Sequence, residues 1–266
     1  MNFWTKQSAE FAQQRNYLDE LYKVYPISPN LEREIPPALE EKISKAFKER
    51  KNKDLIKALL KWELFPIKDS YIPYLKRDNT AIERNPETVN RIAGSLYSMG
   101  FEEMIKKCIQ PKETNRQIGP MFKRWVDLKT IGVDVLTDEE LFIKKKENCI
   151  LNVSDNKMKL FAEKHLGYNR NKGLDFVAKF NNNYVIGEAK FLTDFGGHQN
   201  AQFDDAISTI QTDFSNKKVK ENVIPIAIMD GVLYIEGNNK MYNYLKEHTE
   251  QTIISALLLR EFLYSL

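Results

Sequence analysis

The stretch from Gly173 to Lys190 constrains the fold most, because it predicts two β-strands joined by a polar turn. Residues 174–180 are rich in aromatic and β-branched types, and residues 184–186 repeat that pattern on the return. Three asparagines in a row separate the two runs, and Asn tolerates a positive φ better than most residues. We therefore expect an antiparallel hairpin here.

Three charged residues stand where the predicted strands begin and end. Asp175 begins the first strand, and Glu188 and Lys190 end the second. Side chains two positions apart on a strand point to the same side, so Glu188 and Lys190 share a face. The start of one antiparallel strand lies beside the end of its partner, which places Asp175 next to Glu188.

Two neighbouring carboxylates repel each other, and a divalent cation removes that conflict. Mg²⁺ prefers oxygen ligands and is usually held by one or two carboxylates, several waters and a substrate phosphate. We therefore predict Mg²⁺ at Asp175 and Glu188. Lys190 would hold the attacking water or meet the charge that develops on the phosphate.

An acid followed two positions later by lysine is not specific by itself, because the chain has five such pairs. Only the pair Glu188 and Lys190 ends an apolar strand and follows a second strand-borne acid, so the context carries the prediction. The alternative is a surface hairpin with a solvated ion pair.

The chain resembles the PD-(D/E)XK nuclease superfamily, and within it the type II restriction endonucleases. The residues that carry this resemblance are Asp175 and, further along, Glu188-Ala189-Lys190. The resemblance implies a metal-dependent phosphodiesterase that leaves 5′-phosphates. Its two acids and the Ala189 carbonyl would bind Mg²⁺, and its lysine would assist the water. The core of this likeness covers residues 155–235.

Composition fits an ordinary folded protein, with 42% hydrophobic and 29% charged residues. Neither a run of 18 apolar residues nor a cationic-then-apolar leader occurs, so we expect neither a membrane span nor secretion. Cys108 and Cys149 are isolated and fit a reducing cytoplasm. A net charge of +3 allows a polyanionic partner without requiring one.

The first part of the chain is predicted to be mostly helical. Apolar spacing indicates helices over residues 3–25 and about 36–64. A loop at 66–84 follows, and two shorter helices are expected over residues 86–108. Lysines crowd residues 42–61, where they would line DNA phosphates or form a solvated face.

A polar loop before the helix predicted at 121–129 is the first candidate for reading DNA. Arg116 and Gln117 suit guanine and adenine in a major groove. Lys123 and Arg124 suit phosphates. The alternative is an ordinary basic loop.

Short strand-like pieces follow at 131–135 and 149–153, and a helix is predicted over 157–166 immediately before the hairpin. In nucleases of the resembled family a helix at this point often supplies an extra carboxylate. Glu163 is therefore a further catalytic candidate, and its alternative is a solvent-facing position.

Paired glycines after Lys190 lead to His198, Gln199 and Asn200, which present donors and acceptors beside the predicted site. In the resembled enzymes this position faces DNA. These three side chains are the second recognition candidates. His198 would contact water or phosphate, or lie on the surface with no such role.

The remaining segments complete an α/β pattern. We expect a helix at 200–215, an apolar strand at 222–229 that turns back into 232–235, and a helix at 249–266. A strand pair followed by a helix and another strand predicts a mixed central sheet flanked by helices. Such a sheet is the core of the restriction endonucleases that the chain resembles. A largely helical N-terminal region would precede it.

We therefore divide the chain into a helical DNA-recognition and dimerisation region, residues 1–150, and a nuclease core, residues 151–266. The predicted function is Mg²⁺-dependent, sequence-specific hydrolysis of double-stranded DNA. Cutting a palindrome needs two sites related by a two-fold axis, so we expect a homodimer. The alternatives are a structure-specific repair or recombination nuclease and a non-catalytic DNA-binding module.

Overall fold

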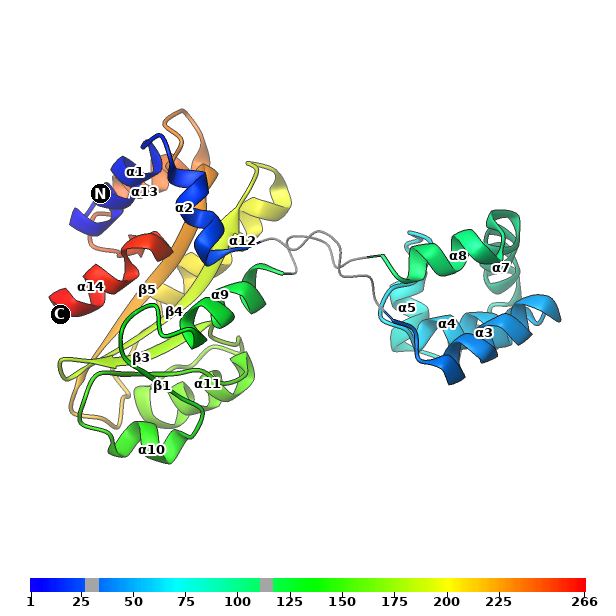
Figure 1. Ribbon diagram of the computed structural model, residues 1–266, viewed down its shortest axis with the longest axis horizontal. Coiled ribbons are helices and arrows are strands. Elements are labelled where there is room, and N and C mark those ends of the chain that lie inside the picture. Colours follow the sequence, from blue (N-terminus) through cyan, green and yellow to red (C-terminus); the bar gives the residue numbers. More distant parts are fainter. Residues whose placement is uncertain (27–33, 111–116) are drawn as a thin grey trace. The chain divides into compact units, whose positions relative to one another are not determined.

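The structure is a computed structural model that describes residues 1–26, 34–110 and 117–266. It divides the chain into two units, one formed by Met1–Ile27 and Thr114–Leu266 and the other by Ser28–Glu113. The first unit carries the sheet and the second is helical (Figure 1). We describe each unit by itself.

The first unit is built on a six-stranded mixed sheet whose strands lie in chain order. The inner strands β2, β3 and β4 pair antiparallel, whereas β1 pairs parallel to β2, and β5 and β6 continue parallel to β4. The strands are β1 (Asp134–Leu136), β2 (Cys149–Leu151), β3 (Phe176–Phe180), β4 (Asn183–Leu192), β5 (Asn222–Gly231) and β6 (Ile253–Ile254). The expected hairpin over residues 174–190 is confirmed, with Asn181 and Asn182 at positive φ in its turn.

Helices cover both faces of this sheet, as the sequence predicted. They are α1 (Phe3–Ala12), α2 (Tyr17–Val24), α9 (Ile118–Asp127), α10 (Glu139–Lys144), α11 (Asp155–Phe161), α12 (Gly197–Ile210), α13 (Lys240–Glu247) and α14 (Leu259–Ser265). Single turns lie at η2 (Ala162–Leu166), η3 (Val232–Tyr234) and η4 (Ala256–Leu258).

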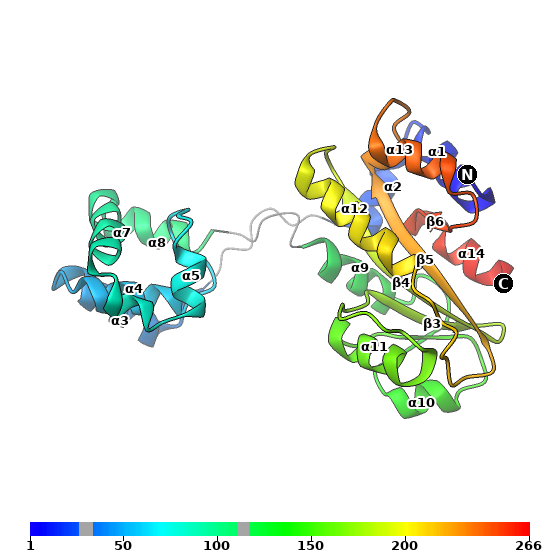
Figure 2. The same cartoon turned by 180° about the vertical axis from the view of Figure 1, so that it is seen from behind.

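Alternation along β4 separates two buried faces. Val185 and Ala189 point to a core that α2, α9 and α14 cover (Figure 1). Ile186 and Leu192 point to the opposite side, where α11 and α12 lie (Figure 2). Glu188 and Lys190 have the same parity as Ile186, so they project toward α11 and α12.

Asp230, near the end of β5, ties the N-terminal segment to the sheet. Its buried carboxylate accepts hydrogen bonds from the hydroxyls of Tyr17 at 3.4 Å, Tyr25 at 3.1 Å and Ser255, and from the Ala256 N–H at 3.2 Å. Burial raises the pKa of Asp230 to about 6, although these hydrogen bonds oppose the rise.

Several predicted elements differ from the structure. The helix expected over residues 3–25 is broken into α1 and α2. The strand predicted at 232–235 is the turn η3, because β5 continues through Gly231 without folding back. The helix expected over 249–266 begins only at η4, since Ile253 and Ile254 pair with β5 as β6.

The second unit is an all-helical insertion with its own core. Its helices are α3 (Pro37–Lys48), α4 (Asn52–Leu60), α5 (Ile72–Arg77), α6 (Ala81–Arg84), α7 (Pro86–Met99) and α8 (Phe101–Cys108). Gly100 adopts a φ of 86° between the last two, as the predicted break requires. The loop expected at 66–84 instead contains α5 and α6, whose apolar residues Ile72, Leu75 and Ile82 are buried in this core.

The boundary expected at residue 150 does not coincide with the division of the structure. Residues 1–27 belong with the sheet, because their aromatic side chains pack on it and bind Asp230. The strands β1 and β2 also precede or span residue 150. The recognition and dimerisation roles assigned to residues 1–150 stay predictions.

Candidate active site

Lys190 joins the two acids of the hairpin. Its Nζ atom donates a hydrogen bond to Asp175 Oδ2 at 3.2 Å and lies 3.0 Å from Glu188 Oε2. All three side chains are at least three-quarters buried. The expected meeting of Asp175 and Glu188 at the open end of the hairpin is thus present in the structure.

The strand register produces this meeting. Phe176 pairs with Gly187, and the Asp175 N–H donates to the Gly187 carbonyl at 3.1 Å, so Asp175 stands beside the next residue, Glu188. The Ala189 N–H then donates to Asp175 Oδ2 at 3.0 Å. A backbone hydrogen bond therefore orients the first carboxylate.

Glu188 is 1% exposed and contacts groups from two other segments. Its Oε1 atom accepts a hydrogen bond from the Thr209 hydroxyl of α12 at 2.8 Å. Its Oε2 atom lies 2.6 Å from the ammonium of Lys172, which also contacts Asp205 of α12. Position on β4 and packing against α12 together place this carboxylate.

These groups surround a small polar cavity of about 280 Å³. It is lined by Asp155, Asn156, Lys172, Gly173, Asp175, Glu188 and Lys190. A second cavity of about 170 Å³ also borders Asp175, Ala189 and Lys190, and the first residues of α9 and Gln202 of α12 close its other side. Asp175 and Lys190 therefore border both cavities, whereas Glu188 borders only the first.

Lys190 is a protonated ammonium in this setting. Burial disfavours its charge, but the carboxylates of Asp175 and Glu188 outweigh that effect and raise the pKa of Lys190 above its usual range. The Lys190 ammonium is therefore a positively charged hydrogen-bond donor between the two acids.

The donor set fits a hard cation with few protein ligands. The described residues contain no group of three or more His, Cys, Asp or Glu side chains arranged to hold a metal. Two carboxylates suffice for Mg²⁺, which keeps several waters. Glu188 Oε2 is buried and has no well-directed hydrogen bond within the described chain, although two ammonium groups face it. An oxygen that already draws two ammonium groups suits a cation.

A comparison with protein families distinguishes a restriction endonuclease from a repair nuclease and from a non-catalytic DNA-binding module. The model described as "Tsp45I type II restriction enzyme" matches residues 2–266. The chain belongs to the Tsp45I type II restriction enzyme family. Searches of curated proteins and of solved structures give no match.

Membership in the Tsp45I family makes the protein a site-specific endonuclease, a hydrolase whose substrate is DNA. Enzymes of this type typically need a divalent metal. The six-stranded mixed sheet with helices on both faces is the α/β fold expected for such an enzyme. No helix within the described part of the chain is long and apolar enough to cross a bilayer.

Glu163, the extra carboxylate predicted for this Tsp45I-family site, lies on η2 and forms an ion pair with Lys159 at 3.4 Å. It does not line the polar cavity, whereas Asp155, at the start of the preceding helix, does. The sequence by itself did not single out Asp155, Lys172 or Asp205. No local pattern links these three residues to the hairpin.

The first group of predicted DNA contacts lies at α9. Arg116 falls outside the described residues, and Gln117 precedes the first turn of the helix. Lys123 donates to the Val153 carbonyl at 2.8 Å and pairs with Asp155, so its charge is already used inside the protein. Arg124 is exposed. Arg124 is therefore accessible to a phosphate.

The second group lies at the start of α12. His198 is exposed and contacts Gln202 at 3.1 Å. Gln199 is 6% exposed, and its amide bonds the N–H and the hydroxyl of Thr193. Asn200 donates to the Phe195 carbonyl at 2.9 Å. Gln199 therefore orders the segment after Lys190, and reading of DNA by any of the three stays a prediction.

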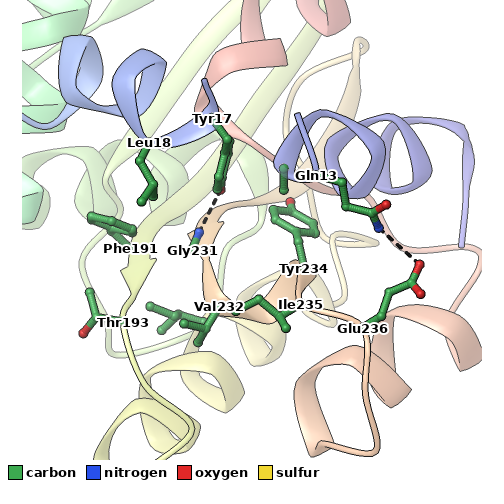
Figure 3. Close-up of a pocket in the computed structure, with 12 residues that line it drawn as sticks. Gln13, Tyr17, Leu18, Phe191, Thr193, Gly231, Val232, Tyr234, Ile235 and Glu236 are labelled. Carbon is green, nitrogen blue, oxygen red and sulfur yellow. Dashed lines mark hydrogen bonds between the residues drawn. The ribbon is translucent and has the colours of Figure 1, made fainter. Parts of the chain in front are cut away.

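A larger cavity of about 690 Å³ lies away from the acids (Figure 3). Its lining is mainly apolar. The Tyr17 hydroxyl accepts from the Gly231 N–H at 2.9 Å and Gln13 donates to Glu236 at 3.1 Å, whereas the buried Tyr234 hydroxyl has no hydrogen bond to the described residues. The larger cavity offers no paired acids, so the smaller polar cavity is the better candidate for phosphodiester chemistry in this Tsp45I-family protein.

Proposed function

We propose that this chain cuts double-stranded DNA with Mg²⁺ at Asp175 and Glu188 and leaves 5′-phosphates. The observation that supports the proposal most directly is the single ammonium of Lys190 held between the two acids, at 3.2 Å from Asp175 and 3.0 Å from Glu188. Family membership gives the DNA substrate, and this geometry supports Asp175, Glu188 and Lys190 as the residues that would act on it.

Each residue has a distinct task in this proposal. Asp175 and Glu188 would hold the cation, and the carbonyl of Ala189, the residue after Glu188, would be a further ligand. Bound Mg²⁺ supplies a Lewis acid for the phosphate and lowers the pKa of a coordinated water. Lys190 would orient the attacking water and offset the charge that accumulates on the phosphate oxygens.

The direct test is digestion of a plasmid of known sequence, with Mg²⁺ and with EDTA. We expect discrete fragments only with Mg²⁺, and ends that polynucleotide kinase labels only after phosphatase treatment. Discrete fragments in EDTA would refute the metal requirement. Ends that accept label without phosphatase would refute the assignment of 5′-phosphates.

We propose a homodimer as the cutting species, because two strands related by a two-fold axis need two copies of the site. Sedimentation of the protein with a duplex containing its site should give two chains per duplex. A single chain per duplex that still cuts both strands would contradict this part of the proposal.

The two alternatives from the sequence are less well supported. A structure-specific repair nuclease would not belong to a type II restriction family. A non-catalytic module would have no reason to bury two acids and two lysines around one cavity, since burying charge costs free energy unless the groups are paired or used.

A further inference from the structure

Lys172 supplies a second ammonium in the polar cavity, from outside the hairpin. Its Nζ atom lies 2.6 Å from Glu188 Oε2 and also contacts the carboxylate of Asp205. The lysine side chain is 25% exposed, whereas that of Asp205 is 43% exposed, so Lys172 connects a buried acid to one nearer the surface.

The contact between Lys172 and Glu188 is held by charge more than by a directed hydrogen bond. Neither Lys172 Nζ nor Glu188 Oε2 has a hydrogen bond of good geometry to the described residues. The other oxygen of Glu188 is already bonded by Thr209. Oε2 is the oxygen of Glu188 that accepts no hydrogen bond from the described residues, and a divalent cation that binds it would meet the charge of Lys172.

We propose that Lys172 occupies the cation position at Glu188 in the metal-free protein and moves to Asp205 alone when a divalent cation binds. Lys172 is thus a positioning residue that competes with the metal. Before metal binding, Lys172 stabilises the carboxylates of Glu188 and Asp205, which would otherwise repel each other. This inference rests on the proposed binding of metal at Asp175 and Glu188.

The test measures the binding of Mn²⁺ to the metal-free protein without DNA. The electron paramagnetic resonance signal of the free ion reports how much Mn²⁺ is unbound. Lys172→Met removes the competing charge and should lower the Kd for Mn²⁺ at least about tenfold. Lys172→Arg keeps the charge and should leave the Kd close to that of the wild type. Lys159→Met, outside the cavity, is the matched control and should change nothing.

Asp205→Asn gives the opposite expectation. Lys172 then has only Glu188 as a partner, so the Kd for Mn²⁺ should rise. The same change made in the Lys172→Met background should have little effect, because Asp205 acts through the lysine. An equal rise in both backgrounds would make Asp205 a direct contributor to cation binding and would contradict the proposed movement.

The outcomes separate two failures. If the wild type binds Mn²⁺ and Lys172→Met binds it no more tightly, the competition is refuted and the metal site stands. If neither binds Mn²⁺, the metal site itself is refuted. Should Lys172→Met fail to fold, the Asp205→Asn variant still tests the direction of the effect.

A separate observation concerns the helical unit. A groove of about 410 Å³ between α3 and α4 is lined by Lys42, Lys45, Lys51, Lys57 and Lys61, with Glu49 and Asp54. The lining residues of each helix recur at three- and four-residue intervals, so each helix presents one charged face to the groove. Lysines dominate both faces.

Ion pairs use only part of this positive charge. Lys51 pairs with Glu49 at 2.7 Å, and Lys57 pairs with Glu83 at 2.8 Å. Lys42, Lys45 and Lys61 are exposed and make no ion pair with any described residue. Three unpaired lysines on one groove attract a polyanion, and the substrate of this family is DNA.

We infer that the α3–α4 groove binds the phosphate backbone of DNA. The test is the salt dependence of DNA binding in EDTA, measured by fluorescence anisotropy. Replacing Lys42, Lys45 and Lys61 with Gln should lower the slope of log K against log salt by about one for each lost phosphate contact. The matched control replaces Lys68, Lys106 and Lys107, which carry the same charge elsewhere on this unit.

An equal loss of slope in both triple variants would show a general charge effect and refute a specific groove. An unchanged slope in the groove variant would refute DNA as its ligand. A wild type that binds no DNA would instead refute the substrate assignment, so the two failures are distinguishable.

Discussion

The backbone N–H of Ala189 donates a hydrogen bond to Asp175 Oδ2 at 3.0 Å. The regular pairing of β3 with β4 begins at Phe176, one residue after Asp175. The Asp175 side chain therefore bonds the partner strand just beyond the last regular pair. The same residue that would offer its carbonyl to a cation thus orients one of the acids. Geometry and charge at Asp175 can therefore be separated by mutation.

Asp175→Asn should keep the hydrogen bond from Ala189, since an amide oxygen also accepts, but it removes the charge. We expect cleavage to fall at least about 100-fold and Mn²⁺ binding to weaken, with little change in thermal stability. Asp194→Asn, an exposed carboxylate just beyond β4, is the control. Retention of Mn²⁺ affinity in Asp175→Asn would remove this residue from the metal site.

Lys190→Ala should lower the rate of cleavage at least about 100-fold while DNA binding survives. The reason is that the ammonium acts on charge that develops during the reaction. The measurement is single-turnover cleavage together with anisotropy in EDTA. Lys179→Ala is a matched control, because Lys179 is also a buried lysine of this hairpin, but it bonds the Lys145 carbonyl at 3.0 Å outside the polar cavity. Unchanged turnover in Lys190→Ala would contradict the assigned role.

Asp230 should make the stability of the protein depend on pH. Its pKa is about 6 in the folded protein against 3.8 ordinarily, so the folded state holds the proton more tightly than the unfolded chain. The resulting stabilisation is present below pH 4 and lost as the pH rises to about 6. It amounts to about 3 kcal/mol.

Urea unfolding of wild type and Asp230→Asn across this range tests the prediction, since the variant lacks the titrating group. The free energy of unfolding of the wild type should fall relative to that of the variant between about pH 4 and pH 7. A difference between the two proteins that stays constant over that range would show that Asp230 does not titrate there.

Gly231→Ala should destabilise the protein by at least about 3 kcal/mol. Gly231 has a φ of +99°, and an added Cβ would lie 1.9 Å from the Leu192 carbonyl oxygen of the neighbouring strand. Gly237→Ala is the control: its Cβ would meet only Asn239, at 3.6 Å, and should change stability by less than about 0.5 kcal/mol. Comparable urea midpoints for the two variants would disprove the steric argument.

The sequence by itself determined the hairpin and the proximity of its charged residues. Alternation with a period of two places Glu188 and Lys190 on one face, the asparagine turn folds the strand back, and strand pairing brings Asp175 beside them. These are local relationships within about twenty residues, and steric rules of the backbone govern them. The sheet with flanking helices followed from the same patterns.

Only the tertiary structure decided what else meets the acids. Lys172, Asp155 and Asp205 come from a loop and two helices, and Thr209 reaches Glu188 because α12 packs on that face of the sheet. The same holds for residues 1–27, which join the sheet through Asp230 and leave the helical unit as an insertion. Such contacts depend on which apolar faces bury each other, and local periodicity shows that a face is buried without naming its partner.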